Sequence, residues 1–138
     1  MSKVKIGARS DIQNEYRPKV LIIDDDATSI EVLKYNLQQA GYKVAIHTKN
    51  LGMIAAINDE RPDLILLDIN MPLLDGPLLC RLVKKNQQFA QTPILLCSAL
   101  NEKRLIKKAA ECKATGYIYK GWGIKQVIKK VGQYLASS

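Results

Sequence analysis

Acidic, basic and hydroxyl side chains occur at four points of the sequence where, if brought together, they could do phosphoryl chemistry. Three carboxylates stand in a row at residues 24–26, another follows at Asp68, and Ser98 and Lys120 come later. Crowded carboxylates repel one another and need a cation between them, and all-oxygen ligands suit Mg²⁺. Lysine offers a compact positive charge to a phosphate oxygen, and serine offers a hydroxyl donor. A carboxylate nucleophile beside a metal and a lysine can form an aspartyl phosphate.

Alternating strand and helix patterns must position these side chains. Short apolar segments, typical of buried parallel strands, alternate from Lys19 onward with segments of helical periodicity. This alternation predicts a doubly wound α/β fold with a five-stranded parallel sheet, flavodoxin-like (βα)5, in strand order 2-1-3-4-5. The predicted strands are 20–23, 44–46, 64–67, 93–97 and 117–119, and apolar positions on the predicted helices span 30–40, 51–57, 78–83, 105–109 and 124–135.

Each of the polar groups named above follows a predicted strand. Asp24, Asp25 and Asp26 follow the first strand, Asp68 the third, Ser98 the fourth and Lys120 the fifth. Sites in doubly wound sheets lie beyond the carboxyl ends of the strands, so these side chains should converge at one edge. Aspartate is also a preferred helix N-cap, and for Asp26 capping of the next helix competes with a role in the site.

Four segments resemble the receiver domains of two-component response regulators. They are Val20–Asp25, Leu67–Gly76 with its pattern D-x-x-M-P-x-x-D-G, the pair Ser98-Ala99, and Gly116–Lys120. The resemblance covers about residues 19–135. It implies a signalling module that acts on no external substrate beyond transferring a phosphoryl group to itself and losing it again.

The resemblance also assigns roles to single residues. Asp68 accepts a phosphoryl group from a histidine kinase or a histidine phosphotransfer protein, and Ser98 and Lys120 bind the phosphoryl oxygens. Mg²⁺ is held by Asp24, Asp25, Asp68 and the backbone carbonyl of Asn70. Ser98 and Tyr117 form the switch, in which Tyr117 turns inward when the Ser98 hydroxyl moves towards the phosphoryl group.

One position departs from the family pattern. The family usually follows its lysine with a proline in cis linkage, whereas this chain has Gly121 after Lys120. Without proline a cis bond costs about 2.5–4 kcal/mol, so a trans peptide is predicted here.

Charge along the chain suggests an arm and an output face. Residues 1–18 are polar and basic and are read as an N-terminal arm, followed by a single receiver domain at 19–138. The net charge is +8, and residues 101–138 hold nine Lys and Arg against two Glu. We expect the face made by the fifth strand and the last two helices to signal to a downstream protein partner, and that partner to be acidic.

Other features bear on location and on the cysteines. No segment is long and apolar enough for membrane insertion and no secretory signal is visible, so a cytoplasmic protein is expected. Cys80, Cys97 and Cys112 form no CxxC pair, and an odd number of thiols fits a reducing compartment. They are expected to be small buried or half-buried side chains rather than zinc ligands.

Three rival functions remain. Asp24, Asp26 and Thr28 also match the D-x-D-x-T pattern of haloacid-dehalogenase-type phosphatases, but those enzymes need late acidic residues for Mg²⁺, and no Asp follows Asp75. A DNA-binding basic domain is suggested by charge alone, without a recognition motif, so nucleic acid is disfavoured. A degenerate receiver that only docks normally lacks part of the acidic set, which is complete here.

Overall fold

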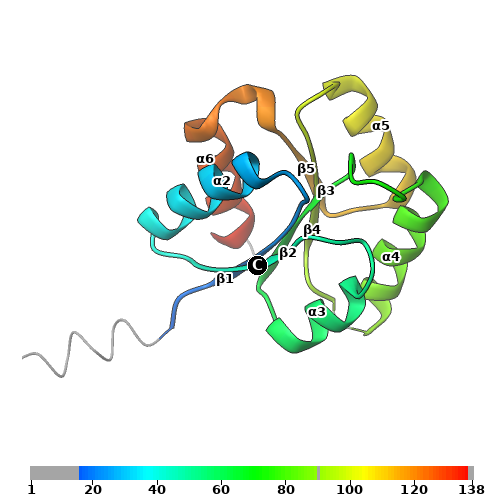
Figure 1. The fold of residues 1–138 in the computed structure, drawn as a ribbon, viewed down its shortest axis with the longest axis horizontal. Coiled ribbons are helices and arrows are strands. Elements are labelled where there is room, and N and C mark those ends of the chain that lie inside the picture. The colour runs from blue at the N-terminus through cyan, green and yellow to red at the C-terminus, as the bar shows by residue number, and fades with distance from the viewer. Residues whose placement is uncertain (1–15, 90, 137–138) are drawn as a thin grey trace, which may run out of the picture.

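The computed structural model describes residues 16–89 and 91–136, so all but the end of the predicted arm lies outside the described residues. Strands and helices alternate along the chain (Figure 1). The strands are β1 (Lys19–Ile23), β2 (Lys43–His47), β3 (Leu64–Asp68), β4 (Ile94–Ser98) and β5 (Gly116–Tyr119). The helices are α2 (Ala27–Gln39), α3 (Met53–Glu60), α4 (Gly76–Phe89), α5 (Glu102–Cys112) and α6 (Ile124–Ala136), with a short 3-10 helix η1 (Lys120–Trp122).

The strands form one parallel sheet in the order β2-β1-β3-β4-β5, which confirms the predicted doubly wound, flavodoxin-like fold. Helices α2 and α6 cover one face, and α3, α4 and α5 cover the other (Figure 1). Alternate residues of each central strand therefore enter different cores, which is why the strands are apolar without a break. In β1, for example, Val20 and Ile22 pack with α2 and α6, whereas Leu21 and Ile23 pack with α3, α4 and α5.

The predicted strands agree with the structure to within one residue at each end. The prediction for the second helix was less accurate. Leu51 is 82% exposed and lies before α3, whose buried residues are Met53 and Ile57. Gly52 adopts φ 80°, a left-handed conformation that separates Leu51 from the helical turn and changes which residues face the sheet.

Side-chain caps define where the helices near the site begin. The Asp26 carboxylate accepts a hydrogen bond from the Ser29 N–H at the start of α2, so the capping interpretation of Asp26 is correct. The predicted cap Asn101 accepts from the Arg104 N–H at the start of α5. Two short loops from the sheet edge are thereby fixed in place.

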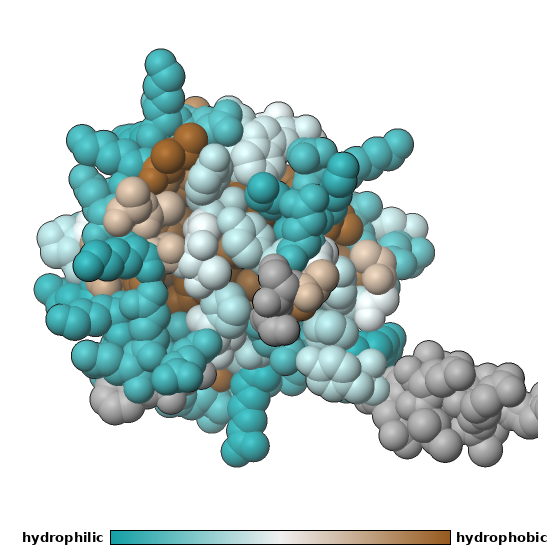
Figure 2. All heavy atoms as spheres, turned by 180° about the vertical axis from the view of Figure 1, so that it is seen from behind, coloured by the Kyte–Doolittle hydropathy of each residue, from teal (hydrophilic) through white to brown (hydrophobic). Residues whose placement is uncertain are grey.

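The surface seen from behind is mostly hydrophilic, with apolar side chains showing as separate patches (Figure 2). Within the described part of the chain, no helix has the length and apolar character needed to cross a membrane.

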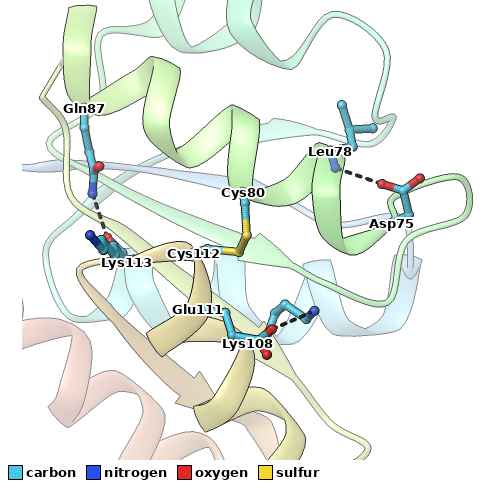
Figure 3. Close-up of a disulfide and its surroundings, with 8 residues drawn as sticks. All are labelled: Asp75, Leu78, Cys80, Gln87, Lys108, Glu111, Cys112 and Lys113. Atoms are coloured by element: carbon cyan, nitrogen blue, oxygen red, sulfur yellow. Dashed lines mark hydrogen bonds and ion pairs between the residues drawn. A yellow bond between two sulfur atoms is a disulfide. The ribbon is translucent and has the colours of Figure 1, made fainter.

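The cysteines differ from expectation. Cys97 is a buried free thiol in β4, as predicted, but Cys80 and Cys112 form a disulfide between α4 and α5 (Figure 3). The expected burial was correct, since Cys112 is buried and Cys80 half-buried, but the expectation of reduced thiols was wrong for this pair. Spacing along the chain did not reveal the pair, because the contact depends on how α4 and α5 pack.

Candidate functional site

The site forms where β1 and β3 end side by side. The two strands pair in parallel with Ile23 opposite Leu67, so the next residues, Asp24 and Asp68, emerge together at the carboxyl edge. Carboxylate oxygens of Asp24, Asp25 and Asp68 lie within 4.8 Å of one another. Asp24 and Asp68 are buried, whereas Asp25 is exposed. The structure thus brings together the three predicted metal-binding side chains.

Lys120 supplies the positive charge of this cluster. It begins η1 directly after β5, and its Nζ lies 2.6 Å from Asp24 Oδ2 and 3.7 Å from Asp68 Oδ2. It also donates to Ser29 Oγ at 2.8 Å. None of the peptide bonds in the described ranges is cis, so the prediction of a trans bond between Lys120 and Gly121 is confirmed.

Burial and charge shift the protonation of these groups in opposite directions. Burial, together with the neighbouring Asp24, raises the pKa of Asp68 to about 6, although the Asn70 N–H and Lys120 favour its charged form. Burial also opposes ionisation of Asp24, but hydrogen bonds from Lys120 and the Asp26 N–H lower its pKa below the usual value. Burial disfavours the Lys120 ammonium, yet Asp24 and Asp68 raise its pKa. Asp24 and Lys120 therefore form a charged pair, next to which Asp68 carries the excess negative charge.

Backbone N–H groups orient both buried carboxylates. The Asn70 N–H donates to Asp68 Oδ1 at 2.9 Å, and the Asp26 N–H donates to Asp24 Oδ1 at 3.0 Å. Each bond closes a short turn just beyond a strand, so the carboxylate is held against the loop that follows it. Asp68 Oδ2 is the oxygen that faces Lys120.

Ser98 is buried at the end of β4 and is turned towards a neighbouring loop. Its hydroxyl donates to Asn70 Oδ1 at 2.7 Å and accepts from the Leu100 N–H at 3.1 Å. Asn70, Ser98 and Leu100 line a cavity of about 290 Å³ together with Asn101 and Arg104 of the β4–α5 region. Space for a group larger than water is therefore present beside Ser98.

Tyr117 and an aromatic cluster lie farther along β5. Tyr117 is half-buried and packs against the core, with its ring centroid 5.9 Å from that of Trp122. The Trp122 indole N–H donates to Glu102 at 3.1 Å. Through Trp122, the segment that follows Lys120 is joined to the first residue of α5.

The residues at the site fit a divalent cation. Three carboxylates face one ammonium, which leaves negative charge uncompensated, and the donors are all oxygen, as Mg²⁺ prefers. Asp26 is not among these clustered carboxylates, and its own carboxylate caps α2.

Three site contacts were missed in the sequence. They are Ser29 as a partner of Lys120, the Asn70 side chain as the acceptor for Ser98, and the Glu102–Trp122 bond. Asn70 stands two residues after Asp68, which signals proximity but not which group its amide meets. Nothing in the sequence marks Ser29 or Glu102, because both contacts join segments far apart in the chain.

Comparison with known proteins agrees with this geometry. The family model described as "Response regulator receiver domain" matches residues 20–132. The chain is 32% identical, over 87% of its length, to the alkaline phosphatase synthesis transcriptional regulatory protein PhoP of Bacillus subtilis. It is 29% identical, over 83% of its length, to the DNA-binding dual master transcriptional regulator RpaA of Synechocystis sp..

The chain spans 49% of PhoP and 47% of RpaA, about half the length of these curated relatives. Among solved structures, it is similar to the chemotaxis response regulator CheY4 of Vibrio cholerae, with a TM-score of 0.72 and 27% identity. That match covers 87% of this chain and 99% of CheY4.

Proposed function

Because the chain belongs to the response-regulator receiver family, a family of phospho-accepting signalling domains, we propose that Asp68 is its phospho-acceptor. The phosphoryl donor is a histidine kinase or a histidine phosphotransfer protein. The observation that carries the proposal is the cluster itself, in which Asp68 shares a pocket with Asp24, Asp25 and the Lys120 ammonium.

Asp68 acts as the nucleophile in this proposal. One of its carboxylate oxygens bonds to phosphorus while the bond from phosphorus to the donor's imidazole nitrogen breaks, and the leaving nitrogen keeps the electron pair. Asp68 must be ionised to attack. Lys120 favours that form, and its ammonium is within reach of a phosphoryl oxygen placed on Asp68 Oδ2.

The carboxylates of Asp24, Asp25 and Asp68, with the Asn70 carbonyl, would hold Mg²⁺. When bound, the ion would offset the negative charge that the phosphoryl group adds to the pocket. Ser98 would bind a further phosphoryl oxygen after its hydroxyl leaves Asn70, and Tyr117 would then turn inward.

Labelling with acetyl phosphate tests the assignment. With Mg²⁺ present, the wild-type chain should gain one acid-stable, base-labile acyl phosphate, detected by intact mass and mapped to Asp68. Asp68→Asn should abolish it, because an amide is not a nucleophile at phosphorus. Removal of Mg²⁺ with EDTA should also suppress it.

A matched substitution separates the receiver chemistry from the phosphatase alternative. Asp26→Asn makes the same carboxylate-to-amide change as Asp68→Asn, but in the segment between β1 and α2. Asparagine remains a good N-cap, so α2 should persist. We expect Asp26→Asn to label like wild type. A chain in which Asp68→Asn still labels, while Asp26→Asn does not, would contradict the proposal.

The downstream partner is proposed to dock on the basic face of α5, β5 and α6. Both glutamates of this region are already engaged, Glu102 with Trp122 and Glu111 with Lys108 at 3.1 Å. The face therefore keeps its excess of lysine and arginine, which favours an acidic protein surface. The exposed basic residues are Lys103, Arg104, Lys107, Lys125 and Lys129, with Lys108 and Lys130 half-buried.

A further inference from the structure

Helices α4 and α5, which both contribute residues to the cavity beside Ser98, are covalently joined. Cys80 of α4 and Cys112, the last residue of α5, form a disulfide with their Cα atoms 4.5 Å apart and a sequence separation of 32. Figure 3 shows the bond between the two helices. Nearby, the Gln87 side chain donates to the Lys113 carbonyl at 2.7 Å. The C-terminal end of α5 is therefore anchored to α4.

The other end of α5 is connected to the phosphorylation site. The Leu100 N–H bonds to the Ser98 hydroxyl, and Asn101, one residue later, caps α5. The same hydroxyl is bonded to Asn70. To bind a phosphoryl oxygen on Asp68, the Ser98 hydroxyl must leave Asn70, and the backbone that is hydrogen-bonded to it must adjust. This adjustment acts on the start of α5, whose C-terminal end is held to α4 by the disulfide.

We propose that Cys80 and Cys112 form a reversible redox modification site that controls phosphorylation. The disulfide holds α5 against α4 in the arrangement described here, with Ser98 turned to Asn70. Reduction releases the C-terminal end of α5 and so favours the arrangement in which Ser98 binds a phosphoryl oxygen. This inference rests on the proposed role of Asp68.

The reductant required is a dithiol, such as a small dithiol protein. Its thiolate attacks the sulfur of Cys80, which is half-buried, whereas Cys112 is 6% exposed. The Cys80–Cys112 bond breaks, and Cys112 leaves as a thiolate and takes a proton. The second thiolate of the reductant then attacks the reductant's first sulfur, which is bonded to Cys80 in the mixed disulfide. Cys80 is released as a thiolate and takes a proton. Two electrons and two protons pass to the cysteine pair, and the reductant becomes a disulfide.

Thermodynamic linkage gives this proposal a second, independent consequence. If reduction increases the affinity for a phosphoryl group, then a bound phosphoryl mimic must favour reduction by the same factor. A disulfide that only stabilises the fold would raise the melting temperature. It would not change the affinity for the phosphoryl mimic, and the mimic would not change the thiol–disulfide equilibrium.

The experiment measures beryllofluoride affinity, with Mg²⁺, for the oxidised and reduced full chain by calorimetry. Alkylation under denaturing conditions first confirms the two states: one thiol should react in the oxidised chain, since Cys97 is free, and three after reduction. We expect reduction to tighten beryllofluoride binding about fivefold or more, the lower end of usual allosteric coupling. In dithiothreitol buffers, beryllofluoride should shift the Cys80–Cys112 equilibrium towards thiols by the same factor.

Two variants make the result specific. The double variant Cys80→Ser, Cys112→Ser should bind beryllofluoride with the affinity of the reduced chain. Dithiothreitol should not change that affinity. Cys97→Ala, which leaves the pair intact, should keep the full response. Equal affinity in the oxidised and reduced states would overturn this inference and leave the proposed function standing. Absence of beryllofluoride binding in both states would overturn the proposed function, and this inference with it.

Discussion

Asp68 and Asp24 lie side by side but have opposite effects on the stability of the metal-free protein. Lys120 is 2.6 Å from Asp24 and 3.7 Å from Asp68, so the ammonium compensates Asp24 more fully. The pKa of Asp24 is lowered and that of Asp68 raised to about 6. Ionised Asp68 therefore lowers the stability of the fold, and the pocket holds uncompensated negative charge.

The pH dependence of unfolding should show this. A carboxyl group with a raised folded-state pKa binds protons more strongly in the native state, so its ionisation destabilises the fold. In EDTA, the Asp68 contribution should fall as the pH rises from about 4, its unfolded pKa, through about 6. Asp68→Asn should therefore raise the free energy of unfolding at pH 7 by about 1–3 kcal/mol, measured by urea denaturation.

Asp24→Asn serves as the control of opposite sign. Its stabilising contribution is present at neutral pH and is lost as the pH falls, because its folded-state pKa is lowered. Asp24→Asn should therefore lower the stability of the metal-free chain at pH 7. If both variants shift stability in the same direction, the charge distribution described here is wrong.

Leu100 should make the phosphorylated state long-lived. Its side chain is 75% exposed at the rim of the cavity beside Ser98, and an apolar group there cannot orient an attacking water. Leu100→Gln should shorten the phosphoryl half-life about tenfold or more, as measured by the decay of the labelled species after the donor is removed. Leu100→Met keeps the position apolar and should decay like wild type. Equal phosphoryl half-lives for Leu100→Gln and Leu100→Met would show that Leu100 does not protect the phosphoryl group.

At the scale of elements, the Tyr134 ring of α6 occupies the space that a side chain at Gly116 of β5 would need. A Cβ at Gly116 would overlap the Tyr134 hydroxyl of α6, so Gly116→Ala must displace that ring. We expect a loss of about 1–3 kcal/mol in the free energy of unfolding, the usual cost of overpacking. Chemical denaturation measures it.

Gly132→Ala is the matched substitution, made within α6. A Cβ there would lie 3.3 Å from the Tyr42 hydroxyl, an approach that a shift of a few tenths of an ångström relieves, and alanine favours helix over glycine by up to about 1 kcal/mol. The variant should be neutral or more stable. A larger loss at Gly132 than at Gly116 would show that the α6 packing differs from that described.

For the whole molecule, charge distribution decides which contacts are favourable. A twofold contact through the basic face of α5, β5 and α6 would place like charges opposite each other. We expect the beryllofluoride-bound chain to stay monomeric at about 50 mM salt, where screening is weak, and any self-association through this face to increase with salt. Sedimentation velocity across an ionic-strength series measures this. A tight dimer that is insensitive to salt would contradict the prediction.

Much of the fold and site followed from local pattern. Apolar runs alternating with helical periodicity predicted the parallel sheet and its strand order, and parallel strands end at a common edge. That geometry alone brings Asp24, Asp68, Ser98 and Lys120 to the carboxyl edge of the sheet, whatever the details of packing. Helix caps such as Asp26 and Asn101 were also predictable, because a cap acts within three residues of its own position.

Other features were decided by the tertiary structure. Which helix face meets the sheet depended on a left-handed turn at Gly52, so Met53 rather than Leu51 entered the core. The Ser98–Asn70 and Glu102–Trp122 bonds depend on side-chain rotamers that are chosen by packing. The Cys80–Cys112 pair formed because α4 and α5 lie side by side on the same face of the sheet. Periodicity in a sequence specifies each element and its apolar side, but the distance between two elements is a property of the packed molecule alone.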